Sequence, residues 1–266
     1  MHQTTYHRPS SIDEAASLFA KGSDAKYLAG GHTLIPVMKQ RLASPSDVID
    51  LGKIKELIGV EATGDGIVVK AATTHYDVAS SETVRKAIPA LAYLASLIGD
   101  PAVRHRGTIG GSLANNDPAA DYPAAVLALG ATVKTNKRSI SADDFFKGLF
   151  STALEDGEII TAVSFPVQAK AGYAKFNHPA SRFALTGVFV AKTPAGDVRV
   201  AATGASQSGV MRVGAIEAAL KANWSAGAID SVKISADGLL NDIHGTADYR
   251  ANLIKVMAQR AVQAAG

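Results

Sequence analysis

The chain has 266 residues, of which 47% are hydrophobic and 19% are charged, a composition typical of a soluble globular protein with about two domains. Its net charge is only +3 and its basic residues are spread along the chain, unlike the concentrated basic surface of a nucleic-acid-binding protein. Cysteine is absent, which excludes disulfides, a thiol nucleophile, Cys-ligated zinc and an iron–sulfur cluster held by this chain's own thiolates, so any redox role needs an organic cofactor or another polypeptide.

The first 55 residues predict a small unit of helices and strands. Ser11-Ile12-Asp13-Glu14 is a capping box, which predicts a helix that runs to about Ala20. Short apolar segments predict strands at residues 26–29 and 48–50. Between them, Gly30-Gly31 predicts a loop, and helical turns are expected over residues 33–41.

Residues 56–167 predict a second and larger subdomain. Two apolar segments flank Gly64-Asp65-Gly66, a strong hairpin signal, and their strands are expected at residues 57–60 and 67–71. Apolar patterning predicts three helices and three further strands; the helices are expected at residues 75–80, 89–98 and 122–129, and the strands at residues 131–135, 138–141 and 158–165. Pro166 and residues 168–172 indicate a domain boundary.

Beyond that boundary the pattern predicts a smaller C-terminal domain. Strands are expected at residues 173–176, 185–192 and 198–203, and helices at residues 213–222 and 247–264. In the last helix Leu253, Ile254 and Met257 recur at helical spacing. The sequence therefore predicts an α+β fold with two or three subdomains.

Nothing in the sequence predicts a membrane segment, a secretion signal or a metal site. The longest apolar stretch, residues 124–131, is far shorter than the roughly 20 residues that span a bilayer. The N-terminus has no hydrophobic signal-peptide region, and the seven histidines show no ligand spacing such as His-x-x-x-His. We therefore expect a cytoplasmic protein with no metal of its own, no transmembrane segment and no nucleic-acid partner.

Two glycine-rich loops carry the chemistry that the sequence suggests. The first, residues 29–34, reads Ala-Gly-Gly-His-Thr-Leu between a predicted strand and a predicted helix. The second reads Arg106-Gly107-Thr108-Ile109-Gly110-Gly111-Ser112. Glycine lets the backbone approach a ligand closely, and successive N–H groups or a helix N-terminus can bind an anion. Two such loops predict a pyrophosphate site, although neither matches the G-x-G-x-x-G or P-loop pattern.

On these residues the chain resembles the FAD-binding medium subunit of the molybdenum hydroxylases, which include the carbon monoxide and xanthine dehydrogenases. The resemblance covers nearly the whole chain, and the second loop is its most specific part. The matching segments are Tyr27-Leu28-Ala29-Gly30-Gly31-His32-Thr33 with Pro36 and Lys39, Val103-Arg104-His105-Arg106-Gly107-Thr108-Ile109-Gly110-Gly111-Ser112-Leu113-Ala114, Asp117-Pro118-Ala119-Ala120-Asp121, and Tyr249-Arg250-x-x-Leu253.

The resemblance implies a fold and a set of partners. Residues 1–167 would form an FAD-binding domain of the vanillyl-alcohol-oxidase (PCMH) type with subdomains of about 1–55 and 56–167, and residues 168–266 an α+β C-terminal domain with an antiparallel sheet. A large subunit would hold the molybdenum cofactor and a small subunit two [2Fe–2S] clusters, in a dimer of heterotrimers. Non-covalent FAD would receive electrons from those clusters and pass them to an external acceptor, a quinone, NAD or another molecule.

The predicted cofactor-binding residues come from the two loops and from four positions of the family pattern. The paired glycines are expected to contact the pyrophosphate, and their neighbours to contribute mainly backbone N–H groups. The complete set is Ala29, Gly30, Gly31, His32, Thr33, Leu34, Ile98, Thr108, Ile109, Gly110, Gly111, Ser112, Asp121, Ile160 and Lys175. No catalytic residue is predicted in this chain.

Each position outside the loops has a structural alternative. Asp121 is expected to accept a hydrogen bond from the ribose or the flavin, or to cap the helix that starts at Tyr122. Ile98 and Ile160 are placed near the flavin ring by the family pattern, or are ordinary core residues. Lys175 reaches the cofactor, or is a solvated lysine on a strand.

Three further features concern the surroundings of the flavin: its attachment, the residue that covers it and the charge beside it. In some distant flavin oxidases a Gly-Gly-His loop bonds the flavin covalently, whereas in this family the position of His32 is a hydrogen-bonding one. Asn177 and Arg182 depart from the family pattern, and Phe183 is expected to cover the flavin. A cation at Arg182 would raise the flavin's reduction potential by favouring the anionic reduced form.

Two other functions remain open at this point. The chain can be a self-sufficient FAD-dependent oxidase or reductase with its own substrate site, or a flavin-free scaffold that only binds partners. The substrate of the complex is not encoded here, because that chemistry would lie in another chain.

Overall fold

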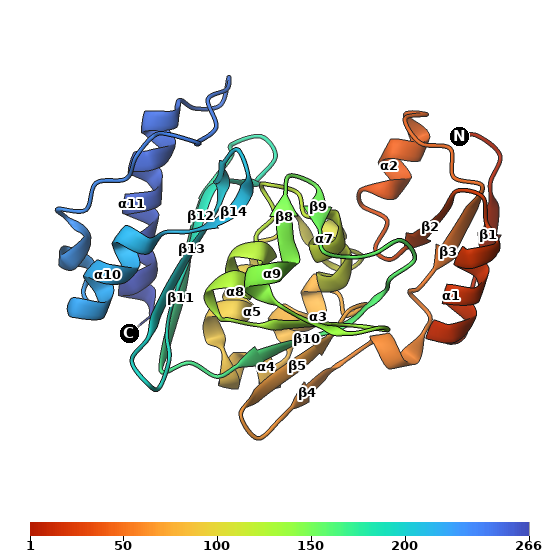
Figure 1. Ribbon diagram of the computed structural model, residues 1–266, viewed down its shortest axis with the longest axis horizontal. Coiled ribbons are helices and arrows are strands. Elements are labelled where there is room, and N and C mark those ends of the chain that lie inside the picture. The colour runs from red at the N-terminus through yellow and green to blue at the C-terminus, as the bar shows by residue number, and fades with distance from the viewer. Residues whose placement is uncertain (266) are drawn as a thin grey trace.

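The computed structural model describes residues 1–265 and is elongated, with three groups of elements that follow one another along its long axis (Figure 1). The N-terminal group lies at one end and the C-terminal helices lie at the other (Figure 1). Separate sheets combined with helices confirm the predicted α+β class. Residue 266, the last of the predicted C-terminal domain, lies outside the described residues.

The N-terminal group is a three-stranded parallel sheet with two helices. The sheet has the order β1-β3-β2 and is built from β1 (Thr5–His7), β2 (Ala25–Leu28) and β3 (Asp47–Asp50). Helix α1 (Ile12–Lys21) begins as predicted, because the Ser11 hydroxyl accepts a hydrogen bond from the Glu14 N–H. Helix α2 (Leu34–Lys39) follows the first glycine loop directly. The group ends at the 3-10 turn η1 (Lys55–Leu57).

The middle group is built on a five-stranded antiparallel sheet. Its order is β4-β5-β10-β6-β7, from β4 (Val60–Ala62), β5 (Gly66–Lys70), β10 (Ile160–Pro166), β6 (Thr132–Thr135) and β7 (Ser139–Ser141). The accompanying helices are α3 (His75–Ser80), α4 (Glu82–Ala87), α5 (Pro89–Ser96), α6 (Pro101–Arg104), α7 (Ile109–Asn115), α8 (Tyr122–Ala128) and α9 (Ala142–Phe145), and a small hairpin joins β8 (Phe146–Gly148) to β9 (Ser151–Thr152). Every residue of α8 is buried, so this helix forms the centre of the main core.

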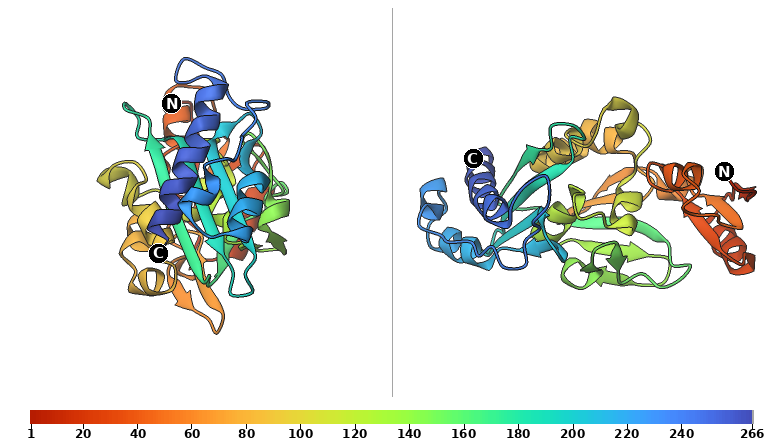
Figure 2. Two further views of the ribbon diagram at one scale, coloured as in Figure 1. Left: turned by 90° about the vertical axis from the view of Figure 1, so that its left-hand side faces the viewer. Right: turned by 90° about the horizontal axis from the view of Figure 1, so that it is seen from above.

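The C-terminal group is the predicted antiparallel sheet with helices. Its strands lie in chain order as β11 (Lys170–Asn177), β12 (Ala184–Lys192), β13 (Val198–Ser206) and β14 (Gly209–Arg212), and its helical elements are α10 (Gly214–Ala222), η2 (Ala226–Ile229) and α11 (Ala247–Ala264). Helix α11 lies across one face of this sheet (Figure 2). Along β12, Val188 and Val190 belong to the core under α11, whereas Phe189 joins the main core. Because successive strand residues point to opposite faces, both faces of the sheet are buried.

The structure corrects several predicted elements. Residues 109–112, expected as part of a loop, are the first turn of α7. The first strand of the predicted hairpin is residues 60–62, because Leu57 ends the 3-10 turn η1. Short elements that the sequence did not reveal are β1, α4, α6, α9, β8, β9 and β14. Within residues 1–265, none of the helices combines the length and hydropathy required to cross a bilayer.

Candidate functional site

The first glycine loop, residues 29–34, packs directly on the backbone of the second glycine segment, residues 107–112. A Cβ added to Gly30 would lie 2.6 Å from the Cα of Gly107, so only glycine fits at this crossing. Gly31 has φ +78°, a left-handed conformation that residues other than glycine adopt only with backbone strain. The glycines of the first loop therefore bring two segments that lie far apart in the chain into backbone contact.

The first glycine loop offers unpaired backbone donors. Within residues 1–265, the N–H groups of Gly30, Gly31, His32, Thr33 and Leu34 have no hydrogen-bond acceptor. Consecutive free N–H groups in a turn form a concave site suited to an anion. This arrangement fits the predicted role of the loop in binding a diphosphate.

The second glycine segment uses its donors internally, so the expectation of free N–H groups at residues 109–112 is wrong. Gly110 N–H donates to the Ala71 carbonyl at 2.8 Å, and Gly111 N–H donates to the Thr108 hydroxyl at 3.1 Å. The N–H groups of Ile109 and Ser112 donate to backbone carbonyls at 3.2 and 3.0 Å. Among residues 1–265, the N–H of Thr108 has no acceptor, and it is the donor this segment retains.

Gly110 has a packing role instead. A Cβ at this position would lie 2.6 Å from the Cβ of Ala71, so the missing side chain lets α7 approach the end of β5. Glycine is a poor helix former, and this close approach, together with the Thr108 cap, explains a helix that begins with Ile-Gly-Gly.

Both glycine segments border a cavity of about 560 Å³. This volume lies within the roughly 300–1,000 Å³ of cofactor and small-molecule sites. The predicted residues that line it are Ala29, Gly30, Gly31, His32, Thr33, Leu34, Ile98, Thr108, Gly110, Gly111, Ser112, Asp121 and Ile160. Ile109 and Lys175 do not line it: Ile109 is fully buried in the main core, and Lys175 lies behind Asp121.

Asp121 is held from behind by two buried donors. The Tyr173 hydroxyl donates to Oδ1 at 2.5 Å, and the Lys175 ammonium lies 3.0 Å from the same oxygen. Lys175 also donates to the Leu97 carbonyl at 3.0 Å, and its side chain is 1% exposed, so the alternative of a solvated lysine is wrong. Burial raises the pKa of the Asp121 carboxyl, and the Lys175 ammonium opposes that rise. The carboxyl makes no cap to α8, so the capping alternative is also wrong.

The two isoleucines border the cavity from different elements. Ile98 lies beyond the end of α5, in a turn fixed by two hydrogen bonds from the Arg104 guanidinium to the carbonyls of Ile98 and Gly99 at 3.1 and 3.0 Å. Ile160 is the buried first residue of β10. They give the cavity apolar walls suited to an aromatic ring system.

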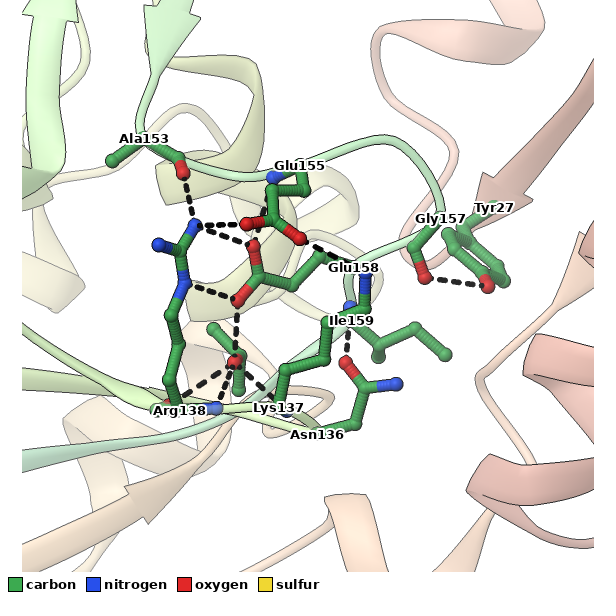
Figure 3. A network of polar contacts seen from close by, with 10 residues as sticks. Tyr27, Asn136, Lys137, Arg138, Ala153, Glu155, Gly157, Glu158 and Ile159 are labelled. Atoms are coloured by element: carbon green, nitrogen blue, oxygen red, sulfur yellow. Dashed lines mark hydrogen bonds and ion pairs between the residues drawn. The ribbon is translucent and has the colours of Figure 1, made fainter.

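Glu158 lines the cavity at the centre of a polar network (Figure 3). Its carboxylate accepts from Arg138 at 3.0 Å, from the Thr135 hydroxyl at 2.7 Å and from the Glu155 N–H at 2.8 Å. The Arg138 guanidinium lowers the pKa of Glu158 to about 2. The network fixes residues 155–159 beside the cavity.

The same segment meets the N-terminal group, because the Tyr27 hydroxyl donates to the Gly157 carbonyl at 3.2 Å (Figure 3). No local sequence pattern indicates this role for Glu158, because Thr135, at the end of β6, and Arg138, in the turn before β7, lie 23 and 20 residues away in the chain.

The segment between β11 and β12 contributes Phe183 to the cavity lining, whereas Asn177 and Arg182 do not line it. Phe183 is 52% exposed, which fits a side chain at the cavity edge. The segment is tied to the loop before α11, because the rings of His178 and His244 share a hydrogen bond of 3.0 Å. His75 also lines the cavity and was missed, because no local pattern distinguishes it from a core histidine.

Comparisons with known proteins agree with this geometry. Residues 2–168 match the family described as the FAD binding domain in molybdopterin dehydrogenase. The chain is 35% identical to the carbon monoxide dehydrogenase medium chain of Hydrogenophaga pseudoflava, over 98% of this chain and 96% of that one. It is 36% identical to the nicotine 6-hydroxylase medium subunit of Paenarthrobacter nicotinovorans, with the same coverage of both chains.

A solved structure shows the same fold. The chain superimposes on a chain of the crystal structure of the Cu,Mo-CO dehydrogenase in its cyanide-inactivated form with a TM-score of 0.89 and 33% identity, over 100% of this chain and 98% of that one. The predicted resemblance is thereby confirmed over the whole fold. The chain belongs to the family of FAD-binding oxidoreductase chains of the molybdopterin dehydrogenases, and its cofactor is FAD.

Proposed function

We propose that this chain is the electron-transfer subunit of a molybdenum-containing hydroxylase, taking electrons from [2Fe–2S] clusters of a partner subunit and passing them to an external acceptor. The observation that carries the proposal is the junction of two glycine segments, with five unpaired N–H groups, at the wall of the cavity of about 560 Å³. FAD supplies the electron chemistry when bound. The chain's own residues bind it, orient it and limit its contact with water.

Each part of the cavity suits one part of FAD. The free N–H groups of Gly30 to Leu34, with the N–H of Thr108 and the hydroxyl of Ser112, bind the diphosphate. Ile98, Ile160 and Phe183 contact the isoalloxazine ring. Asp121, fixed by Lys175, accepts a hydrogen bond from a hydroxyl of the cofactor. The attachment is non-covalent, with His32 as a hydrogen-bonding residue.

The rest of the machinery belongs to other chains. Because this chain has no cysteine, the clusters need the thiolates of a small subunit. The curated relatives are called medium chains or medium subunits, which supports a complex with a large molybdenum-cofactor subunit as well. We propose a cytoplasmic dimer of heterotrimers, in which residues 1–167 bind FAD and residues 168–266 form the second domain.

The test is to co-express the chain with the genes that flank it and to purify the complex through a tag on this chain. We expect a cysteine-rich small subunit and a molybdenum-containing large subunit to copurify in equal amounts. In the complex, the substrate should bleach the flavin absorbance only when the cluster subunit is present. A chain that oxidises a substrate alone, with no partner bound, would instead identify a self-sufficient flavin oxidoreductase.

The attachment of the cofactor is tested separately. Acid precipitation of the yellow protein should leave the flavin in the supernatant. Yellow colour that stays in the pellet would contradict the non-covalent assignment and point to His32 as the attachment site.

A further inference from the structure

His75 is a buried side chain at the junction of the two glycine segments. The residue is 5% exposed and borders the cavity. Its backbone N–H donates to the Gly107 carbonyl at 2.9 Å, and a Cβ added to Gly107 would lie 2.5 Å from the ring nitrogen Nε2. Gly107 in turn is the residue on which Gly30 packs. His75 therefore lies next to the place where the free N–H groups of the first loop are found.

Neither ring nitrogen of His75 has a hydrogen-bond partner among residues 1–265. Nδ1 is fully buried, so Nε2 is the nitrogen left to face the cavity. A buried polar atom without a partner costs about 1–3 kcal/mol. The cavity is the place from which a bound molecule can supply the missing partner.

Tyr122, whose ring lies beside that of His75, also has a polar atom that lacks a hydrogen-bond partner in the described chain. Its hydroxyl is also fully buried without a partner in the described chain, and its ring centroid lies 5.3 Å from that of His75. Burial raises the pKa of Tyr122, so the hydroxyl keeps its proton and can donate it. Because both atoms are buried and unpartnered on neighbouring rings, a hydrogen bond between the Tyr122 hydroxyl and Nδ1 of His75, direct or through one buried water, would satisfy both.

The charge state of His75 follows from its surroundings. Burial, with the nearby His32 and Arg104, lowers the pKa of His75 to about 3, so the ring is neutral at pH 7. A neutral imidazole carries one N–H, and the hydrogen bond at one nitrogen decides which nitrogen holds the proton. If Nδ1 accepts from Tyr122, Nε2 carries the proton and donates into the cavity.

We propose that His75 binds the diphosphate of FAD through Nε2–H, and that Tyr122 is a positioning residue that fixes this tautomer through Nδ1. The diphosphate is the expected acceptor because Nε2 lies beside Gly107, at the glycine junction where the unpaired donors of the first loop gather. The inference rests on the proposed FAD-binding function and adds two residues to that site.

The experiment measures the affinity of the full chain, freed of flavin, for FAD and for ADP. ADP carries the diphosphate without the flavin ring, so it locates the contact. His75→Phe should weaken both probes by about tenfold, the factor that corresponds to about 1.4 kcal/mol. Tyr122→Phe keeps the ring and removes only the hydroxyl, and should weaken both about threefold. Tyr76→Phe, next to His75 but 46% exposed, is the matched control and should change neither.

A second measurement has its decisive readout on the wild-type chain, so that readout does not depend on how well the variants fold. Nitrogen-15 NMR of the FAD-loaded wild-type chain, labelled at histidine, reports which nitrogen of His75 is protonated. We expect a single neutral ring with the proton on Nε2, and a mixture of tautomers in Tyr122→Phe. A proton on Nδ1, or ADP affinity unchanged by His75→Phe, would overturn this inference alone. A wild-type chain that binds neither FAD nor ADP would overturn the proposed function and this inference with it.

Discussion

Gly30 lies against Gly107 so closely that the first glycine loop and the second glycine segment touch through their backbones. Gly30→Val would force these segments apart and displace the free donors of the first loop. We expect FAD affinity to fall at least about tenfold, or about 1.4 kcal/mol, while the circular dichroism spectrum is retained. Gly64→Ala is the control, because a Cβ there meets no atom within 4 Å, and it should bind FAD normally. Equal affinities for the two variants would contradict the site.

Lys175 and Asp121 form a buried ion pair, so removing the cation leaves a carboxyl without compensation. We expect Lys175→Met to lower the free energy of unfolding by about 3 kcal/mol, measured by urea denaturation. Adding Asp121→Asn removes the buried charge and should restore part of that loss. A double variant that is less stable than the sum of the two single changes predicts would argue against this pairing.

Glu158 makes the stability of the fold depend on pH between 4.5 and about 2. Its pKa is about 2 in the folded chain against an ordinary 4.5, so the carboxylate stabilises the fold above pH 4.5, and that contribution is lost as the pH falls toward 2. Glu158→Gln should lower stability by about 2 kcal/mol at pH 7 and flatten the pH dependence between 4.5 and 2. The measurement is denaturant unfolding across this range.

The control for that series is Glu82→Gln, since Glu82 and Lys86 form a highly exposed pair 3.4 Å apart. An exposed pair of this kind contributes less than about 1 kcal/mol, so the control should follow the wild-type curve. If Glu158→Gln follows the same curve, the network of Figure 3 does not stabilise the protein.

Removal of FAD should loosen the N-terminal group selectively. A side-chain hydrogen bond from the Tyr27 hydroxyl to the Gly157 carbonyl, of 3.2 Å, joins it to the rest, and the cofactor would bridge the same gap. We expect amide hydrogen exchange in β2, α2 and β3 to rise about tenfold or more in the apo chain. Exchange in β12 and β13 should stay within about twofold, and a uniform rise would contradict a bridging role.

The strongest sequence patterns predicted whole elements. Helix α11 occupies the expected residues 247–264, because its apolar residues at helical spacing are the ones that the sheet buries. Helix α3 was also placed correctly. The two glycine-rich segments were correctly identified as neighbours of one site, because both line the same cavity. They can touch there because Gly30 has no side chain.

The sequence misled where tertiary packing overrides local preference. Gly110 and Gly111 disfavour a helix, yet the contact of Gly110 with Ala71 and the Thr108 cap stabilise one there. That helix uses the amides which the loop interpretation left free. His75 and Glu158 were missed for a different reason. The backbone of His75 is bound to Gly107, and the Glu158 carboxylate to Thr135 and Arg138, all distant in the chain, and a single sequence does not reveal such neighbours.

The inner face of the C-terminal sheet has a consequence for how the protein unfolds. Tyr173, Phe189, Ala191 and Ala201 of this sheet belong to the same apolar cluster as helix α8 of the middle group. A cut near residue 168 would expose that cluster on both fragments. The family model ends at residue 168, but the apolar core continues across that position. The middle and C-terminal groups should therefore unfold together in one cooperative transition.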